Sequence, residues 1–185
     1  MTVALVLVAV LVVVLIFVGV LFNRMVRLRN EADTGWANID VQLKRRNDLI
    51  PNLVETVKGY AAHERGTFEA VTQARAAVAG ARGPAAAGEA DNLLTAAIGR
   101  LFAVAEAYPD LKANENFLQL QNELSATEDK IAAARRYYNA TVLRFNNAIQ
   151  TFPAVLLAGV FGFSKREFFA AEEADRELPA VSFRS

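Results

Sequence analysis

Few side chains in this chain are of types that perform catalysis, and their spacing does not bring them together. His63 is the sole histidine and stands next to Glu64, and the chain contains no cysteine. Adjacent residues of a helix diverge by about 100 degrees, so a catalytic pair is not expected and a solvated His63 is the better interpretation. Sites that need two histidines or a thiolate are excluded.

The carboxylates are equally scattered. Asp40, Glu55 and Glu69 could ligate a cation only if other helices supplied matching oxygens, and their spacing predicts no such meeting. The acidic cluster near the carboxyl end is typical of a solvated surface; it consists of Glu172, Glu173, Asp175 and Glu177. No glycine-rich phosphate loop, nucleophile elbow or calcium-binding loop occurs. We therefore predict no catalytic, cofactor-binding or metal-ligating residues, no cofactor, and a protein that is not an enzyme.

The basic cluster Lys44-Arg45-Arg46 carries more information than the acidic residues. Three consecutive residues of a helix point to different faces, and Arg46 is in phase with the apolar residues around it. We expect Arg46 to be partly buried and paired with a carboxylate, Glu64 and Glu128 being the candidates. The whole chain has 20 basic and 20 acidic residues, which gives no reason to expect a nucleic-acid partner.

A membrane anchor precedes these polar residues. The run VALVLVAVLVVVLIFVGVLF, from Val3 to Phe22, has no charge and would span about 30 Å as a helix, the thickness of the hydrocarbon core of a bilayer. It lacks the basic start and cleavage site of a signal peptide, so we predict one transmembrane helix. Arg24, Arg27 and Arg29 follow it and are placed for anionic headgroups. They predict an outside amino terminus, with residues 23–185 in the cytoplasm.

Helical periodicity continues after the anchor. Apolar residues recur mostly at steps of three, four or seven, at Trp36, Ile39, Leu43, Ile50, Leu53, Val57, Ala61, Phe68, Val71 and Val78. Pro51 predicts a kink or a short break between Asn47 and Asn52, and the unchanged phase favours one bent helix over two antiparallel ones. The first true turn is expected at Gly80–Gly88, which contains three glycines and a proline.

Two further helices are predicted, near Ala86–Ala107 and over Phe117–Phe152, the second about 55 Å long and ended by Pro153. The predicted fold is all-α, a single amino-terminal transmembrane helix followed by an elongated antiparallel helical bundle. The predicted domains are an anchor over residues 1–22, a bundle over 23–153, and a segment over 154–185.

The last segment is a short apolar helix within Ala154–Phe163 followed by a mostly extended tail, because Gly159, Gly162 and Pro179 prevent one long helix. The apolar part needs cover. Packing on the bundle, insertion into the membrane interface and contact with a partner remain alternatives.

Long ordered strings of this sequence resemble the LemA family of bacterial membrane proteins. The likeness begins at WANIDVQLKRRNDLIPNLVETVKGYAAHE, Trp36–Glu64. It continues through AYPDLKANENFLQLQNEL, TEDKIAAARRYYNATV and FNNAIQTFP, the last ending at Pro153. It also includes the anchor and the GFSKREFF region. Gly35 stands where alanine is expected, and Phe145 where tyrosine is commoner.

The resemblance implies a bacterial single-pass protein with a cytoplasmic helical bundle and no established catalytic activity or active-site set. Relatives are associated with membrane zinc metalloproteases and with proteins that carry a TPM domain, and one relative is linked to magnetosome membranes. These associations are hints about partners.

Two hypotheses of function follow. The first is a non-catalytic adaptor or scaffold in the inner membrane, anchored through residues 3–22, whose bundle binds a protein partner. The alternative is a self-associating, membrane-organising protein that uses Ala154–Phe169 at the bilayer, so charged substitutions of Phe161, Phe168 or Phe169 should prevent lipid binding. The anchor has no GxxxG motif to indicate a dimer, and the oligomeric state stays open.

Overall fold

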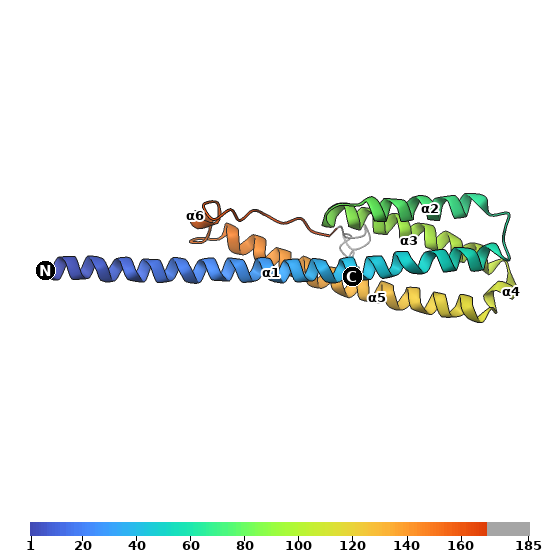
Figure 1. Ribbon diagram of the computed structural model, residues 1–185, viewed down its shortest axis with the longest axis horizontal. Coiled ribbons are helices and arrows are strands. Elements are labelled where there is room, and N and C mark those ends of the chain that lie inside the picture. The colour runs from blue at the N-terminus through green and yellow to red at the C-terminus, as the bar shows by residue number, and fades with distance from the viewer. Residues whose placement is uncertain (170–185) are drawn as a thin grey trace, which may run out of the picture.

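The computed structural model describes residues 1–169, and in that range the chain forms helices joined by short turns (Figure 1). The predicted all-α class is confirmed. The helices are α1 Thr2–Lys58, α2 Arg65–Gly80, α3 Pro84–Glu106, α4 Pro109–Lys112, α5 Glu115–Gln150 and α6 Val155–Ala158.

Helix α1 is continuous over 57 residues, about 85 Å. Pro51 lies inside it, so the expected break is absent and the single-helix alternative is correct. Proline removes the hydrogen bond to the carbonyl of Asn47. Ile50 and Leu53 on either side of it are fully buried, and this packing holds the helix together.

The chain first reverses at residues 59–64, so the prediction that Gly80–Gly88 is the first turn was wrong. The amide of Ala61 still donates to the carbonyl of Val57 at 2.9 Å, and Ala61 remains fully buried inside the turn. Helix α2 then folds back, with Phe68 and Val71 in the same core as α1. The apolar period continues through the turn because the residues before it in α1 and after it in α2 pack in the same core.

The two later helices agree with their predictions. Gly83 adopts a positive φ of 84° between α2 and α3, and Pro84 is at the start of α3, where its missing N–H costs nothing. At the start of α5, the side chain of Asn114 accepts a hydrogen bond from the amide of Phe117 at 3.1 Å.

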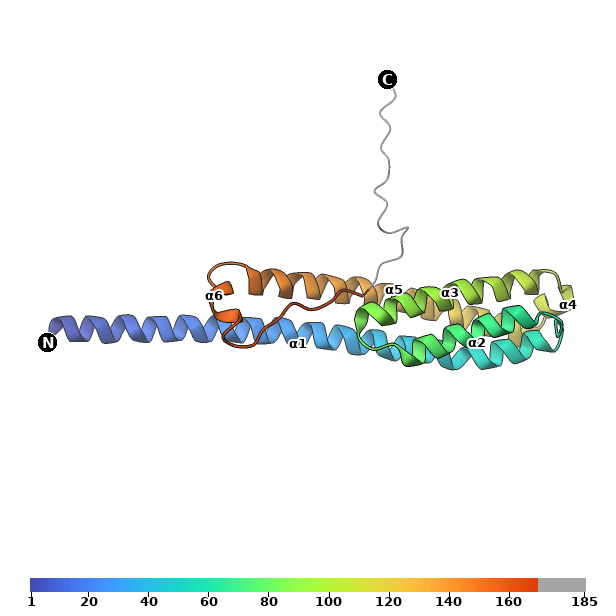
Figure 2. The ribbon, with the colours of Figure 1, turned by 90° about the horizontal axis from the view of Figure 1, so that it is seen from above.

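Helix α5 runs antiparallel to α1, and the α2–α3 hairpin covers only the half of this pair that is distant from the anchor (Figures 1 and 2). At Gly35, a Cβ atom would lie 3.3 Å from the Cα of Tyr138, so glycine allows a close approach of α1 and α5. The predicted elongated bundle is confirmed as a shape with four long helices at the distal end and two at the proximal end.

Within residues 1–169, the buried apolar side chains form three clusters along the long axis. The distal cluster contains residues of α1, α2, α3, α4 and α5, and the middle cluster contains Tyr138. The proximal cluster contains Met25 of α1, Phe145 and Ile149 of α5, and Ala158 and Phe163 from the chain after α5. The predicted short apolar helix after Pro153 is therefore present, and one of its sides packs on the protein itself.

Candidate functional site

The distal bundle contains a buried ionic cluster, which we define as Arg46, Asp91 and Glu128. Arg46 is only 4% exposed; its Nη1 donates to Oδ1 of Asp91 at 2.7 Å, and its Nη2 lies 2.8 Å from Oε2 of Glu128. Burial and pairing of Arg46 are confirmed, with Glu128 and not Glu64 among its partners. Asp91 was missed, because the sequence does not show which face of α3 meets α1.

The cluster connects three helices through one side chain. Two carboxylates face one guanidinium, so it is suited to fixing the positions of α1, α3 and α5. The neighbouring Lys44 and Arg45 are exposed, and Lys44 pairs with Asp40 on the surface. No nucleophile or histidine belongs to the cluster.

The other residues considered for chemistry are dispersed. His63 is exposed in the turn after α1, Glu55 pairs with Lys58 at 3.0 Å, and Glu69 is exposed on α2. Within residues 1–169, no three His, Asp or Glu side chains form a group that could hold a metal. The acidic cluster at residues 172–177 lies outside the described part of the chain.

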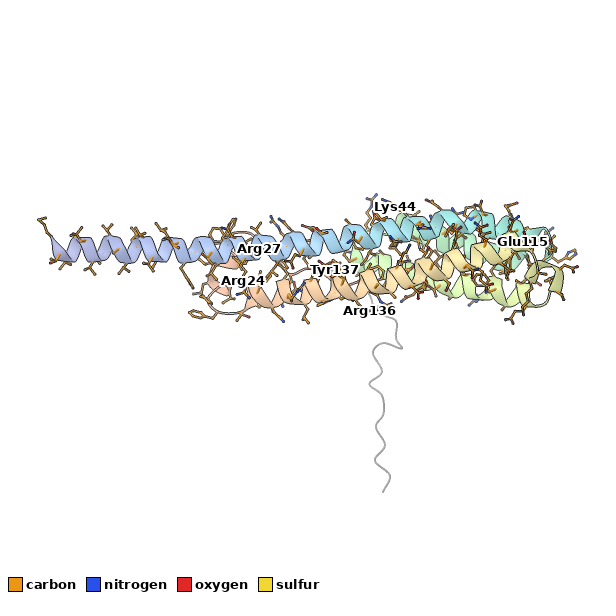
Figure 3. All side chains as sticks on the ribbon, turned by 90° about the horizontal axis from the view of Figure 1, so that it is seen from below. Arg24, Arg27, Lys44, Glu115, Arg136 and Tyr137 are labelled. Atoms are coloured by element: carbon orange, nitrogen blue, oxygen red, sulfur yellow. The ribbon has the colours of Figure 1, made fainter. Side chains whose placement is uncertain are left out.

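The proximal end presents a different kind of surface. The first part of α1 is long and apolar enough to cross a membrane, and none of its apolar stretch is covered by the protein. In Figure 3, the side chains there are almost entirely carbon until Arg24 and Arg27, where the charged part of α1 begins.

An exposed apolar loop, residues 152–161, lies beside the end of this stretch. Phe152 is 76% exposed, Leu156 67% and Val160 80%, all in a segment of ten residues. The ring of Phe161 lies 5.0 Å from that of Phe22, the last residue of the predicted span. The apolar loop therefore continues the apolar surface of α1 on a second segment of chain.

The extended chain at residues 163–169 returns along the bundle from the apolar loop, and two asparagines of α5 hold it. Asn146 donates to the carbonyl and accepts from the amide of Arg166, both at 2.9 Å. Asn139 makes the same pair of bonds to Phe169, at 3.2 and 3.0 Å. Seven residues of helix and three of extended chain both advance about 10 Å, so the two spacings match.

Phe168 and Phe169 belong to this returning chain and not to the apolar loop. Phe169 is buried, and its ring lies 6.4 Å from Trp36, about 21 Å along α1 beyond Phe22. The expectation that Phe169 meets the bilayer is therefore wrong, because the asparagine bonds carry the chain away from the anchor. Trp36 is partly buried and lies against Tyr138 at the middle cluster.

The hydroxyl of Tyr138 donates to the carbonyl of Glu167 in the same returning chain at 2.8 Å. Burial raises the pKa of this hydroxyl, although the charge of Arg166 nearby acts in the opposite direction. Arg166 itself pairs with Asp33 of α1 at 2.6 Å.

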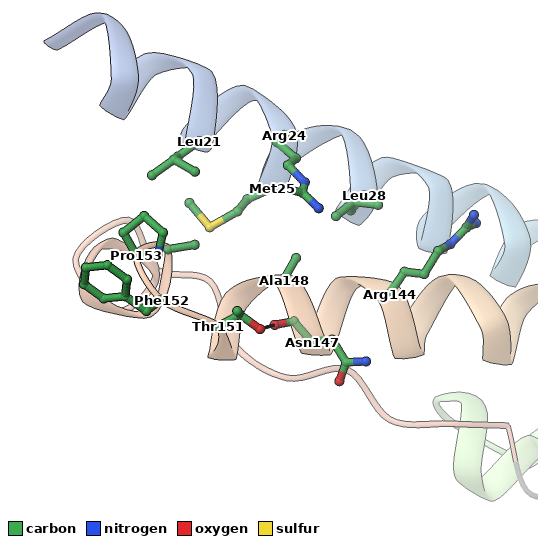
Figure 4. A pocket seen from close by; sticks show the side chains of 11 residues that line it. Leu21, Arg24, Met25, Leu28, Arg144, Asn147, Ala148, Thr151, Phe152 and Pro153 are labelled. Atoms are coloured by element: carbon green, nitrogen blue, oxygen red, sulfur yellow. Dashed lines mark hydrogen bonds between the residues drawn. The ribbon is translucent and has the colours of Figure 1, made fainter. Parts of the chain in front are cut away.

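A cavity of about 360 Å³, the proximal cavity, opens between α1, α5 and the apolar loop (Figure 4). Arg24 of α1 and Arg144 of α5 line it, and both side chains are exposed; in Figure 4 the guanidinium of Arg144 extends from α5 toward α1, beyond Leu28. The cavity is lined by Leu21, Arg24, Met25, Leu28, Arg144, Asn147, Ala148, Thr151, Phe152, Pro153 and Ala154.

A second hollow, of about 230 Å³, lies on the distal hairpin, and we define it as the α2–α3 groove. Its floor is formed by small side chains, with the largely exposed Leu93 at its edge. The groove is lined by Ala70, Gln73, Ala74, Ala77, Leu93, Ala96, Ala97 and Arg100.

Comparisons with known proteins agree on one family. The model of the LemA family matches residues 35–183. Protein LemA of Metamycoplasma hominis is 30% identical, over 83% of this chain and 71% of its own length. Magnetosome protein MamQ of Magnetospirillum gryphiswaldense is 28% identical and MamQ 2 of Paramagnetospirillum magneticum 29%, each over 83% of this chain. The match spans 66% of the length of each MamQ protein.

Proposed function

Because the chain belongs to the LemA family, we propose that it is a membrane-anchored, non-catalytic adaptor or scaffold whose helical bundle binds another protein. The proposed location is the bacterial inner membrane, with the amino terminus outside and the bundle in the cytoplasm. Arg24, Arg27 and Arg29 directly after the apolar stretch support this orientation.

The observation that carries the proposal is the continuity of α1 from the apolar stretch into the distal core. No loop intervenes between Phe22 and Lys58, a distance of about 54 Å along the helix. Ile39, Ile50 and Val57 on this part are fully buried in the bundle. A continuous arm of this kind would hold a docking surface at a set height above the bilayer.

We place that docking surface at the α2–α3 groove. The groove is at the end distant from the anchor, and its alanines allow the backbone of a partner helix to approach closely. Leu93 offers an exposed apolar contact, and Arg100 and Gln73 offer polar contacts at the rim. The occupant that fits is an amphipathic helix of a protein partner.

Photo-crosslinking in cells tests this surface directly. A photoreactive amino acid replaces Leu93 in the groove, and a matched control variant carries it at Leu118, which is also exposed but lies on α5. A second control retains residues 1–30 alone as an anchor. Complexes are recovered from native membranes and their members identified.

A partner that crosslinks from position 93, but from neither control, would support the adaptor. The membrane metalloproteases and TPM-domain proteins suggested by the family resemblance are the first partners to look for. Crosslinked oligomers that contain only this chain would favour the self-associating alternative. Equal crosslinking of a partner from positions 93 and 118 would contradict the docking surface.

A second proposal concerns the membrane and is favoured by the apolar loop. Its exposed side chains continue the apolar surface of α1 at Phe22, and burial of such groups in a bilayer contributes about 1.5–3 kcal/mol per large side chain. We propose that the apolar loop enters the leaflet that α1 leaves. The chain would then contact the bilayer at two segments, which would limit rotation of the bundle about the anchor.

Spin labelling tests this contact with the full chain. The absence of cysteine allows a single cysteine to be introduced at Leu156 or Val160, with Leu93 as the distal control. In lipid nanodiscs, labels at 156 and 160 should be accessible to oxygen and protected from a water-soluble nickel chelate, and a label at 93 should show the reverse. Equal exposure of all three labels to the chelate would contradict insertion.

A further inference from the structure

We propose that the proximal cavity is a binding site for one acidic phospholipid, whose phosphate lies between Arg24 and Arg144. This goes beyond the adaptor function, and it takes the depth of the cavity from the proposed transmembrane span of α1, which ends at Phe22. The cavity volume of about 360 Å³ falls within the range of small-molecule sites.

The charge of the lining favours a phosphate. Arg24 and Arg144 come from antiparallel helices, and the lining contains no carboxylate. A guanidinium presents paired donors that match phosphate oxygens. The ion pair of Arg144 with Glu31, which is outside the cavity, is long, at 3.4 Å, and the two side chains are 57% and 37% exposed, so water screens the pair and it competes weakly for Arg144.

The rest of the lining favours a lipid over a soluble anion. Leu21, Met25, Leu28 and Phe152 form the apolar part of the lining, next to the two arginines. Leu21 and Phe152 also adjoin the apolar surfaces of α1 and the apolar loop, so an acyl chain could leave the cavity without entering water. A small phosphate ion would leave these walls unused.

The depth of the cavity agrees with that of a headgroup. If Phe22 marks the edge of the hydrocarbon core, the backbone of Arg24 lies about 3 Å beyond it and that of Leu28 about 9 Å. The headgroup layer is about 5–8 Å thick on each side of the bilayer. The cavity therefore spans the layer in which lipid phosphates lie.

Native mass spectrometry of the full chain tests the site. The protein is released from micelles that contain equal amounts of phosphatidylglycerol and phosphatidylcholine, and bound lipids are counted. The test variant is Arg24→Gln/Arg144→Gln. The control variant Arg27→Gln/Arg136→Gln removes the same charge from α1 and α5, at positions outside the cavity lining.

The parent and the control should retain one phosphatidylglycerol, and the test variant should retain it about tenfold less. Glu31→Gln should increase retention, because Arg144 then loses its competing carboxylate. An excess of glycerol phosphate should leave the lipid bound; displacement would show a soluble-phosphate site instead. Equal retention by the test and control variants, or of both lipids, would overturn the proposal. The spin-label depths are measured independently, so either proposal can fail alone.

Discussion

At the scale of single residues, Arg46 joins α1, α3 and α5 through one guanidinium, which pairs with Asp91 and Glu128. Asp91 beside it is also buried. Buried charges that lose their partner destabilise a protein by about 3–5 kcal/mol, whereas replacement of a whole buried pair by apolar groups is often tolerated.

We predict that Arg46→Met lowers the free energy of unfolding by about 3 kcal/mol, and that Arg46→Asp lowers it more, since a third carboxylate joins two others. The double variant Arg46→Met/Asp91→Leu should recover most of the loss. Urea unfolding of the detergent-solubilised chain, followed by circular dichroism, measures all three. Equal destabilisation by Met and Asp would show that the charge of Arg46 is not what matters.

Tyr138 gives a prediction about how the stability of the fold depends on pH. Its pKa in the folded protein is raised above the unfolded value of about 10, so the neutral hydroxyl favours folding. The stability that the neutral Tyr138 hydroxyl contributes is fully present below about pH 10 and is lost as the pH rises through the pKa of the folded protein. Tyr138→Phe should therefore weaken the fall in stability above pH 10, while costing about 1 kcal/mol at neutral pH through the bond to Glu167.

The exposed neighbour Tyr137 supplies the control for this prediction. Tyr137→Phe should leave the alkaline fall in the unfolding midpoint nearly unchanged. If the two variants have the same profile between pH 8 and 12, burial of Tyr138 is not the cause of the dependence.

At the scale of elements, the asparagine bonds of α5 decide where the chain after α6 lies. Asn146→Ala removes both bonds to Arg166, so the amide of Arg166 should exchange with deuterium at least about tenfold faster. Asn147→Ala, a change at the exposed adjacent residue, is the matched control. Hydrogen exchange resolved at single amides makes the measurement, and unchanged protection of Arg166 in Asn146→Ala would contradict the role of these bonds.

The same scale shows what the sequence can predict here. The anchor, α3 and α5 follow from local signals, namely an uncharged run, a repeating apolar period and flanking prolines. The turn at residues 59–64 could not be predicted, because the buried Ala61 continues the apolar period of α1 through the turn. The partner Asp91 and the bonds from Asn139 and Asn146 depend on which faces meet in three dimensions, and periodicity along one helix does not contain that information.

For the whole molecule, the continuous helix α1 connects the proposed lipid-binding region at its amino-terminal end with the proposed docking surface on α2 and α3 at the other. The two ends are distant in space and differ in chemistry, apolar and arginine-rich near the anchor and alanine-rich on α2 and α3. A bundle attached through a continuous helix can hold a bound partner at a fixed distance from the membrane surface, whereas a flexible linker after the span could not.

The continuity of the arm is the central claim, and a single distance distribution tests it. Cysteines introduced at Val20 and Lys58, both within α1, carry spin labels, and the distance between them is measured by pulsed electron resonance in lipid nanodiscs. One helix predicts a single narrow peak near about 57 Å. A broad distribution, or a peak markedly shorter, would place a hinge between the membrane and the bundle and contradict the account.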